Sequence, residues 1–123
     1  MRRGDLGTTY GDGDEIVREG ETGSCMFVIQ AGKVEVVHGA NGDAQRLAVL
    51  SEGDFFGEMA LFGQAQRSAT VRALGEARVL KVDKRTLLRR IHEDPLLALT
   101  LLESLSARIR RLNDQVTRLG GVP

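Results

Sequence analysis

Short apolar stretches separated by glycine fill residues 10–82. Met26–Gln30 contains a continuous apolar run, which is typical of a strand buried on both faces, whereas Lys33–Val36 alternates between apolar and polar side chains. The same pattern predicts further strands at Glu15–Arg18, Arg46–Leu50, Ala69–Leu74 and Arg78–Val82. Several short, closely spaced strands favour a sandwich or a barrel.

Glycines stand where these strands are expected to turn. They include Gly11, Gly13, Gly20, Gly23, Gly32 and Gly53. Gly39–Asp43 contains an Asn-Gly pair, which tolerates the positive φ of a tight turn and so predicts a hairpin. Gly75-Glu76 is predicted to join the last two strands.

The pattern becomes helical at Asp83, which is a candidate N-cap for a helix from Lys84 to about His92. Asp94-Pro95 then predicts a second helix, because aspartate caps well and proline suits the first helical position. This helix is expected to run to Leu119, before two glycines end it.

Apolar residues recur along the second helix in alternating steps of four and three, which is the spacing of a two-helix seam. They are Ala98, Leu102, Leu105, Ile109, Leu112, Val116 and Leu119. Charged and polar residues flank this stripe, so we expect a homodimer formed through residues 102–119. The alternative is a helix that lies along its own barrel.

Length and charge fit one small domain. The chain has 123 residues and a net charge of zero, but residues 1–66 are acidic and residues 67–123 are basic. The basic half lacks the clustered basic and aromatic residues that would favour nucleic-acid binding. The expected organisation is a tail or edge strand at 1–9, a barrel at 10–83, helices at 84–119 and a tail at 120–123.

The single cysteine, Cys25, sits in an apolar run and has no second cysteine for an internal disulfide. We expect it to be a core side chain in a protein of the reducing cytoplasm. The sequence contains no signal peptide and no apolar run of membrane-spanning length, so no membrane partner is expected.

The segment from Phe55 to Val71 is the candidate for chemistry. Gly57–Phe62 is long enough for one or two turns of helix that Gly63 would end. Gly57 at its start lets a ligand approach free backbone N–H groups, which together with the helix dipole favour an anion.

Arg67 strengthens this interpretation, because it shares the strand parity of Ala69 and Val71 and would then point into the barrel. An inward guanidinium is costly unless an anion meets it. Glu58 could supply that anion in an ion pair without ligand. In the other arrangement Arg67 binds a phosphate, aided by the Ser68 hydroxyl, and Glu58 accepts a hydrogen bond from a ribose 2′-hydroxyl.

Phe56–Leu61 followed by Arg67–Val71 resembles the phosphate-binding cassette of the cyclic nucleotide-binding domain family. That family includes bacterial cAMP receptor proteins, protein kinase A regulatory subunits and gated ion channels. Ile16–Gly20 and Met26–Ile29 resemble its early strands, so the similarity extends over about residues 10–119. It is nearest to the sensor domain of the bacterial cAMP receptors.

The resemblance implies a mainly β fold: a jelly-roll barrel followed by a short helix and a long C-terminal helix. It implies a ligand such as cAMP, with cGMP as the other possibility, and no metal. Arg67 would bind the cyclic phosphate and Glu58 the ribose. The implied phosphate-side set is Gly57, Glu58, Met59, Arg67, Ser68 and Ala69, and the implied purine-side set is Val36, Leu47, Ala48 and Asn113. The long helix would act as a lid, and Leu105–Asn113 is similar to the dimer helix of the bacterial receptors.

Other functions fit the sequence less well. No helix-turn-helix follows the long helix, so we expect an excised sensor module or a stand-alone binding protein without DNA binding. A jelly-roll metalloenzyme would need clustered ligands, whereas His38 lies near a hairpin and His92 on a helix. One cysteine cannot hold an iron–sulfur cluster. With no nucleophile and base evident, we expect no enzyme. A dimerisation module of the same fold that no longer binds nucleotide stays open.

Overall fold

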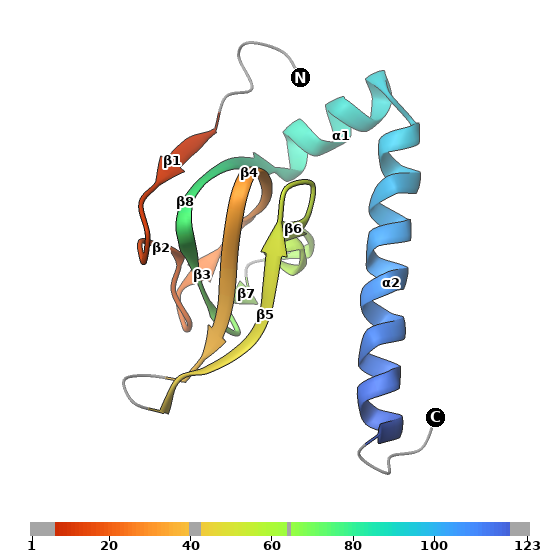
Figure 1. Cartoon of the computed structure of the whole chain (residues 1–123). Coiled ribbons are helices and arrows are strands. Elements are labelled where there is room, and N and C mark those ends of the chain that lie inside the picture. Colours follow the sequence, from red (N-terminus) through yellow and green to blue (C-terminus); the bar gives the residue numbers. More distant parts are fainter. Residues whose placement is uncertain (1–6, 40–42, 64, 119–123) are drawn as a thin grey trace. The chain divides into compact units, whose positions relative to one another are not determined.

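The computed structural model describes residues 7–39, 43–63 and 65–118, with the strands first and the α-helices last (Figure 1). The strands are β1 (Thr8–Tyr10), β2 (Glu15–Val17), β3 (Thr22–Gly23), β4 (Cys25–His38), β5 (Gln45–Ser51), β6 (Phe55–Phe56), β7 (Ala65–Gln66) and β8 (Thr70–Asp83). The helices are the 3₁₀ helix η3 (Glu58–Phe62), α1 (Lys84–Glu93) and α2 (Leu96–Arg118). The expected fold class, mainly β followed by a short and a long helix, is confirmed.

Two long strands organise the sheet. Its path runs β1-β8-β4-β5, while β2 also pairs with β8 and β6 with β4, and all these pairs are antiparallel. β3 and β7 form a separate two-stranded ladder. The described strands give no pairing between β1 and β5, so the sheet is a β-roll and not a strictly closed barrel.

The predicted strand breaks at Gly32 and Gly75 are wrong, because β4 and β8 are each continuous strands of 14 residues. Gly32 has a φ of 83° and lies where the register between β4 and β8 shifts. A Cβ at Gly32 would collide with the Glu76 carbonyl. Glycine there lets two paired strands approach closely at an irregularity instead of turning the chain. Gly23, also assigned to a turn, lies in β3.

The end of the β4–β5 ladder lies where the hairpin was expected. His38 pairs with Gln45 as the last register pair before the connection. Gly39 has a φ of 97°, but residues 40–42 of the predicted hairpin lie outside the described residues. The hairpin turn itself therefore stays a prediction.

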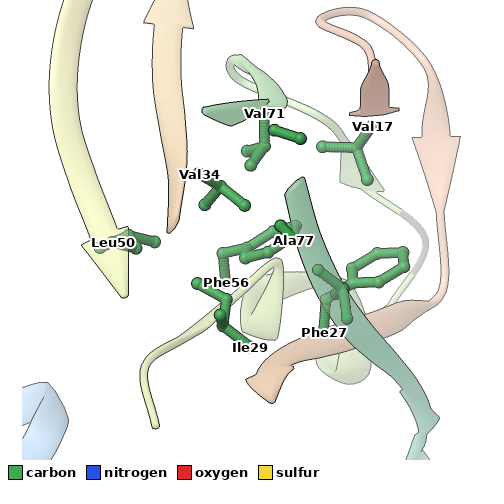
Figure 2. Packing of buried hydrophobic residues seen from close by; sticks show 10 residues of the cluster. Val17, Phe27, Ile29, Val34, Leu50, Phe56, Val71 and Ala77 are labelled. Atoms are coloured by element: carbon green, nitrogen blue, oxygen red, sulfur yellow. The ribbon is translucent and has the colours of Figure 1, made fainter. Parts of the chain in front are cut away.

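Buried apolar side chains from β2, β4, β5, β6 and β8 form the core (Figure 2). Met26, Ile29 and Val34 are the most completely buried large side chains. The rings of Phe27 and Phe56 stack with centroids 5.1 Å apart. Burying each such side chain stabilises the fold by about 1.5–3 kcal/mol, which makes this core the main source of stability in the sheet.

The chain divides into two compact units between Lys84 and Arg85. The second unit contains α2 and nearly all of α1. The Leu96 N–H donates to Asp94 Oδ1 at 3.2 Å, so Asp94 caps α2 as predicted. Within the described residues, every helix is too short or too polar to cross a membrane.

Glu35 links three strands of the sheet through two arginines. Its Oε2 accepts from Arg72 Nε at 2.8 Å and its Oε1 accepts from Arg46 Nε at 3.1 Å, while the side chain of Glu35 is only 12% exposed. The hydrogen bond from Arg72, reinforced by Arg46, holds the pKa of Glu35 below its ordinary value against the opposing effect of burial.

We expect Glu35→Gln to lower the free energy of unfolding by about 1 kcal/mol at pH 7. Because the folded pKa of Glu35 is lowered, its pairing contributes fully above the ordinary carboxyl pKa and is lost as pH falls through the lower folded value. Urea unfolding from pH 7 to pH 3 should therefore show a shallower acid decline in the variant. Glu15→Gln, which removes the more exposed pair with Arg18, is the control. An acid decline as steep as in the unchanged chain would contradict this account.

Candidate functional site

The segment from Phe55 to Val71 forms β6, η3, β7 and the start of β8. Gly57 has a φ of 78° immediately before η3, and Gly63 has a φ of 146° immediately after it. These glycines bound the short helix where the sequence predicts it. The Ala60 N–H donates to the Gly57 carbonyl at 3.2 Å, so the N–H groups of Glu58 and Met59 lie in the first turn, before this bond.

Arg67 lies in the connection between β7 and β8, so the assumption that it belongs to the following strand is wrong. Its guanidinium is nevertheless partly buried. Nη2 donates to the Cys25 carbonyl at 2.9 Å and Nη1 donates to the Gly57 carbonyl at 3.3 Å. The guanidinium carbon stands 5.6 Å from the Phe27 ring centroid, within cation–π range. Two main-chain carbonyls and one aromatic face thus fix the guanidinium in the fold.

Two glycines make room for that guanidinium. A Cβ on Gly23 would overlap the guanidinium of Arg67, and a Cβ on Gly57 would lie 2.7 Å from Nη1. Both contacts are too short for real atoms, so any larger residue would displace the Arg67 side chain. The positive φ of Gly57 also favours glycine at this position.

The backbone of Arg67 is also held firmly. Its N–H donates to the Glu21 carbonyl at 2.7 Å, and its own carbonyl accepts from the Gly20 N–H at 2.8 Å. Nearby, Thr70 Oγ1 accepts from the Glu19 N–H at 3.0 Å. The turn that follows β2 therefore fixes the main chain from which Arg67 projects.

A cavity of about 230 Å³ adjoins the guanidinium. It is lined by Val17, Glu21, Thr22, Gly23, Ser24, Cys25, Phe27, Arg67 and Lys81. The two cations give it a positive character, offset in part by Glu21. Arg67 thus borders open space as well as protein, as a group that meets a small anion must.

The structure places the other predicted site residues as follows. Around the cassette, Glu58 is half-buried, Met59 and Ser68 are exposed, and Ala69 is buried. On the β4–β5 ladder, Val36 is half-buried and lies directly across from Ala48, with Leu47 next to it and 58% exposed. None of these residues lines the cavity beside Arg67. Asn113 lies on α2, in the second unit.

Sequence reasoning missed three parts of the Arg67 environment. The Cys25 carbonyl carries no sequence signal, since every residue has one. Phe27 was assigned only to the core, and Gly23 only to a turn. The one available signal was a glycine shortly before a buried strand, because a glycine near a strand can mark a close approach instead of a turn.

The family assignment rests on a direct match. The family model described as "Cyclic nucleotide-binding domain" matches residues 8–94, which include the whole cassette and every described strand. The chain belongs to the cyclic nucleotide-binding domain family.

Two relatives resemble this chain in sequence. The chain is 37% identical over 81 residues to a cAMP-dependent protein kinase regulatory subunit of Blastocladiella emersonii, which is 65% of this chain and 20% of that protein. It is 30% identical over 108 residues to a CRP-like cAMP-activated global transcriptional regulator of Mycobacterium tuberculosis, which is 87% of this chain and 48% of the regulator.

Among solved structures, the catabolite activator protein of Thermus thermophilus matches with a TM-score of 0.76 and 29% identity. The match covers 92% of this chain and 54% of that protein. The chain therefore spans between about a fifth and about half of the length of these relatives.

Proposed function

We propose that this chain is a non-catalytic sensor that binds a cyclic nucleotide, with cAMP as the preferred ligand. The observation that carries the proposal is the Arg67 guanidinium, held by the Cys25 and Gly57 carbonyls beside an open cavity. Membership of the cyclic nucleotide-binding domain family supports the same ligand class.

Arg67 is suited to a cyclic phosphate for an electrostatic reason. Carbonyl dipoles orient a guanidinium but do not neutralise its charge, so the side chain still favours an anion. Its planar donor array matches phosphate oxygens, and prior ordering removes part of the entropy cost of binding. The Ser68 hydroxyl and the N–H groups of Gly57, Glu58 and Ala69 are the further donors that we assign to the phosphate.

We assign the ribose to Glu58. It begins η3 directly after Gly57, and it is half-buried rather than fully solvated. A carboxylate only accepts hydrogen bonds when ionised, which suits a ribose 2′-hydroxyl and disfavours a phosphate. Division of the two ligand groups between Glu58 and Arg67 would select a ligand that carries both.

The purine is assigned to residues of β4, β5 and α2. Val36 and Ala48 are paired across β4 and β5, with Leu47 beside them, and would provide an apolar surface for a base. Asn113 on α2 is proposed as a polar contact to the purine. The proposed preference for cAMP over cGMP rests on Ser68 and Asn113, and on the cAMP-dependent and cAMP-activated relatives named above.

Signal transmission is assigned to the C-terminal helices. The α2 residues Leu102, Ile109, Leu112 and Val116 are between 45% and 60% exposed in the single chain. We propose that they form a homodimer seam and that ligand binding favours the α2 position that closes over the nucleotide, as a shift between existing conformations. The competing function is a dimerisation module without nucleotide, which would keep the seam and show no ligand response.

We expect cAMP to raise the melting temperature of the protein, because a ligand that binds only the folded state stabilises it.

Calorimetry should show cAMP binding weakened by about 10- to 100-fold in Glu58→Ala, since a hydrogen bond to a charged group is lost. The same variant should bind 2′-deoxy-cAMP as the unchanged chain does, because that ligand lacks the hydroxyl.

The two measurements test nucleotide binding and the assignment of Glu58 to the ribose separately. No response of the folded protein to cAMP or cGMP at millimolar concentration would favour the dimerisation module. An equal loss of affinity for cAMP and 2′-deoxy-cAMP in Glu58→Ala would contradict the assignment of Glu58 to the ribose, while the unchanged chain would still be a cyclic-nucleotide binder.

A further inference from the structure

The end of β4 makes a side-chain contact with the cassette that the proposed phosphate contacts do not include. His38 Nδ1 lies 3.2 Å from the Ser68 carbonyl oxygen and 3.1 Å from Glu19 Oε1. Glu19 Oε1 also accepts from the Gly39 N–H at 3.1 Å. We call Glu19, His38 and Ser68 the His38 bracket, because together they join the turn after β2, the end of β4 and the cassette.

Both partners of His38 Nδ1 are acceptors, which fixes the proton on that nitrogen. A carbonyl oxygen only accepts, and so does an ionised carboxylate. Nδ1 must therefore carry hydrogen, in the neutral Nδ1–H tautomer or in the imidazolium form. His38 is thus a donor whose single Nδ1–H is shared between the Ser68 carbonyl and the Glu19 carboxylate.

The bond to the Ser68 carbonyl sets the direction of the next N–H group. The Ser68 carbonyl and the Ala69 N–H belong to the same peptide unit, which is planar and trans. A carbonyl that points to His38 makes the Ala69 N–H point the opposite way. Ala69 is one of the residues assigned to the phosphate, so rotation of this peptide would turn a phosphate donor away.

His38 contributes little to the core. Its side chain is 61% exposed, and it is absent from the buried apolar cluster. The segment it contacts is otherwise anchored on both sides, by the Arg67 bonds to Gly20 and Glu21 and by the Thr70 bond to Glu19. Its distinct effect is therefore on the peptide between those anchors.

We propose that His38 is a positioning residue for the cyclic phosphate, acting through the Ser68–Ala69 peptide. This inference rests on the proposed function, since it deepens the description of the same binding site. His38 would then affect ligand affinity from outside the cassette, without itself contacting the nucleotide.

The test compares His38→Leu with His38→Asn, because the asparagine amide can place a donor near the position of Nδ1. His38→Leu should bind cAMP about fivefold more weakly by calorimetry, while His38→Asn stays within about twofold of the unchanged chain. The ¹⁵N–¹H amide signal of Ala69 in ligand-free protein should shift in His38→Leu and move back in His38→Asn. His92→Leu, a change of the same type at an exposed position on α1, is the control and should leave both measurements unchanged.

The outcomes distinguish the two proposals. If the unchanged chain binds no cyclic nucleotide, the proposed function fails and the role of His38 in affinity fails with it. If the unchanged chain binds cAMP and His38→Leu binds equally well, only the positioning role is overturned. An equal loss in His38→Leu and His38→Asn would also overturn it, because a donor at that position would then not matter.

Discussion

Arg67→Leu is expected to weaken cAMP binding by about 100-fold or more, while the sheet stays folded. Loss of two charge-assisted hydrogen bonds to a phosphate corresponds to about 3 kcal/mol or more, and each tenfold change in affinity to about 1.4 kcal/mol. Leucine keeps an apolar contact with Phe27, and Cys25 lines a cavity that water can enter. Calorimetry gives the affinity, and urea unfolding should give a free energy within about 1 kcal/mol of the original.

Arg67→Lys separates charge from shape at the same position. Lysine keeps the positive charge but cannot donate to the Cys25 and Gly57 carbonyls and to a phosphate in one planar array. We expect an affinity between those of Arg67→Leu and the unchanged chain. If Arg67→Leu binds cAMP normally, the guanidinium is not part of the binding site.

Gly23→Ala is expected to weaken cAMP binding by about 30-fold, although Gly23 is not assigned to any ligand contact. A Cβ at Gly23 would overlap the guanidinium of Arg67, so that side chain would have to leave the Cys25 carbonyl. The penalty of about 2 kcal/mol reflects loss of the preset geometry rather than loss of the charge. The affinity should be measured by calorimetry at a temperature where the variant is fully folded.

Gly11→Ala is the matched control for Gly23→Ala. Among the described residues, a Cβ at Gly11 would meet only Asp14 Oδ2, at an ordinary contact distance of 3.5 Å. Its affinity for cAMP should stay unchanged. If Gly23→Ala binds cAMP as tightly as Gly11→Ala does, the position of the guanidinium in the fold is not the one that the ligand uses.

Local pattern predicted most of the elements but not the lengths of the central strands. The α-helices begin where Asp83 and Asp94 predict, because capping and proline preferences depend on neighbours in the sequence. The continuity of β4 through Gly32 depends instead on β8, which approaches closely at Glu76. A glycine pattern alone does not distinguish a turn from an irregularity within paired strands.

The residue types of the site were predictable from the sequence, whereas the contacts that hold these residues in place were not. Gly57 and Gly63 bound a short helix as the sequence indicates, and Arg67 is partly buried as parity suggested, although it lies outside the strand on which that argument relied. The Cys25 carbonyl and the His38 bracket come from segments far away in the sequence. Main-chain acceptors have no sequence signature, so contacts of this kind require the fold.

The most direct test of the central claim is a titration of ¹⁵N-labelled protein with cAMP, followed by NMR of the Arg67 Nε–Hε group and the cassette amides. The claim is that a guanidinium ordered by the protein receives the cyclic phosphate. It predicts that the largest shifts occur at Arg67 Nε–Hε and at the N–H groups of Glu58, Ser68 and Ala69. Saturable binding that leaves these signals in place, with shifts elsewhere, would contradict it.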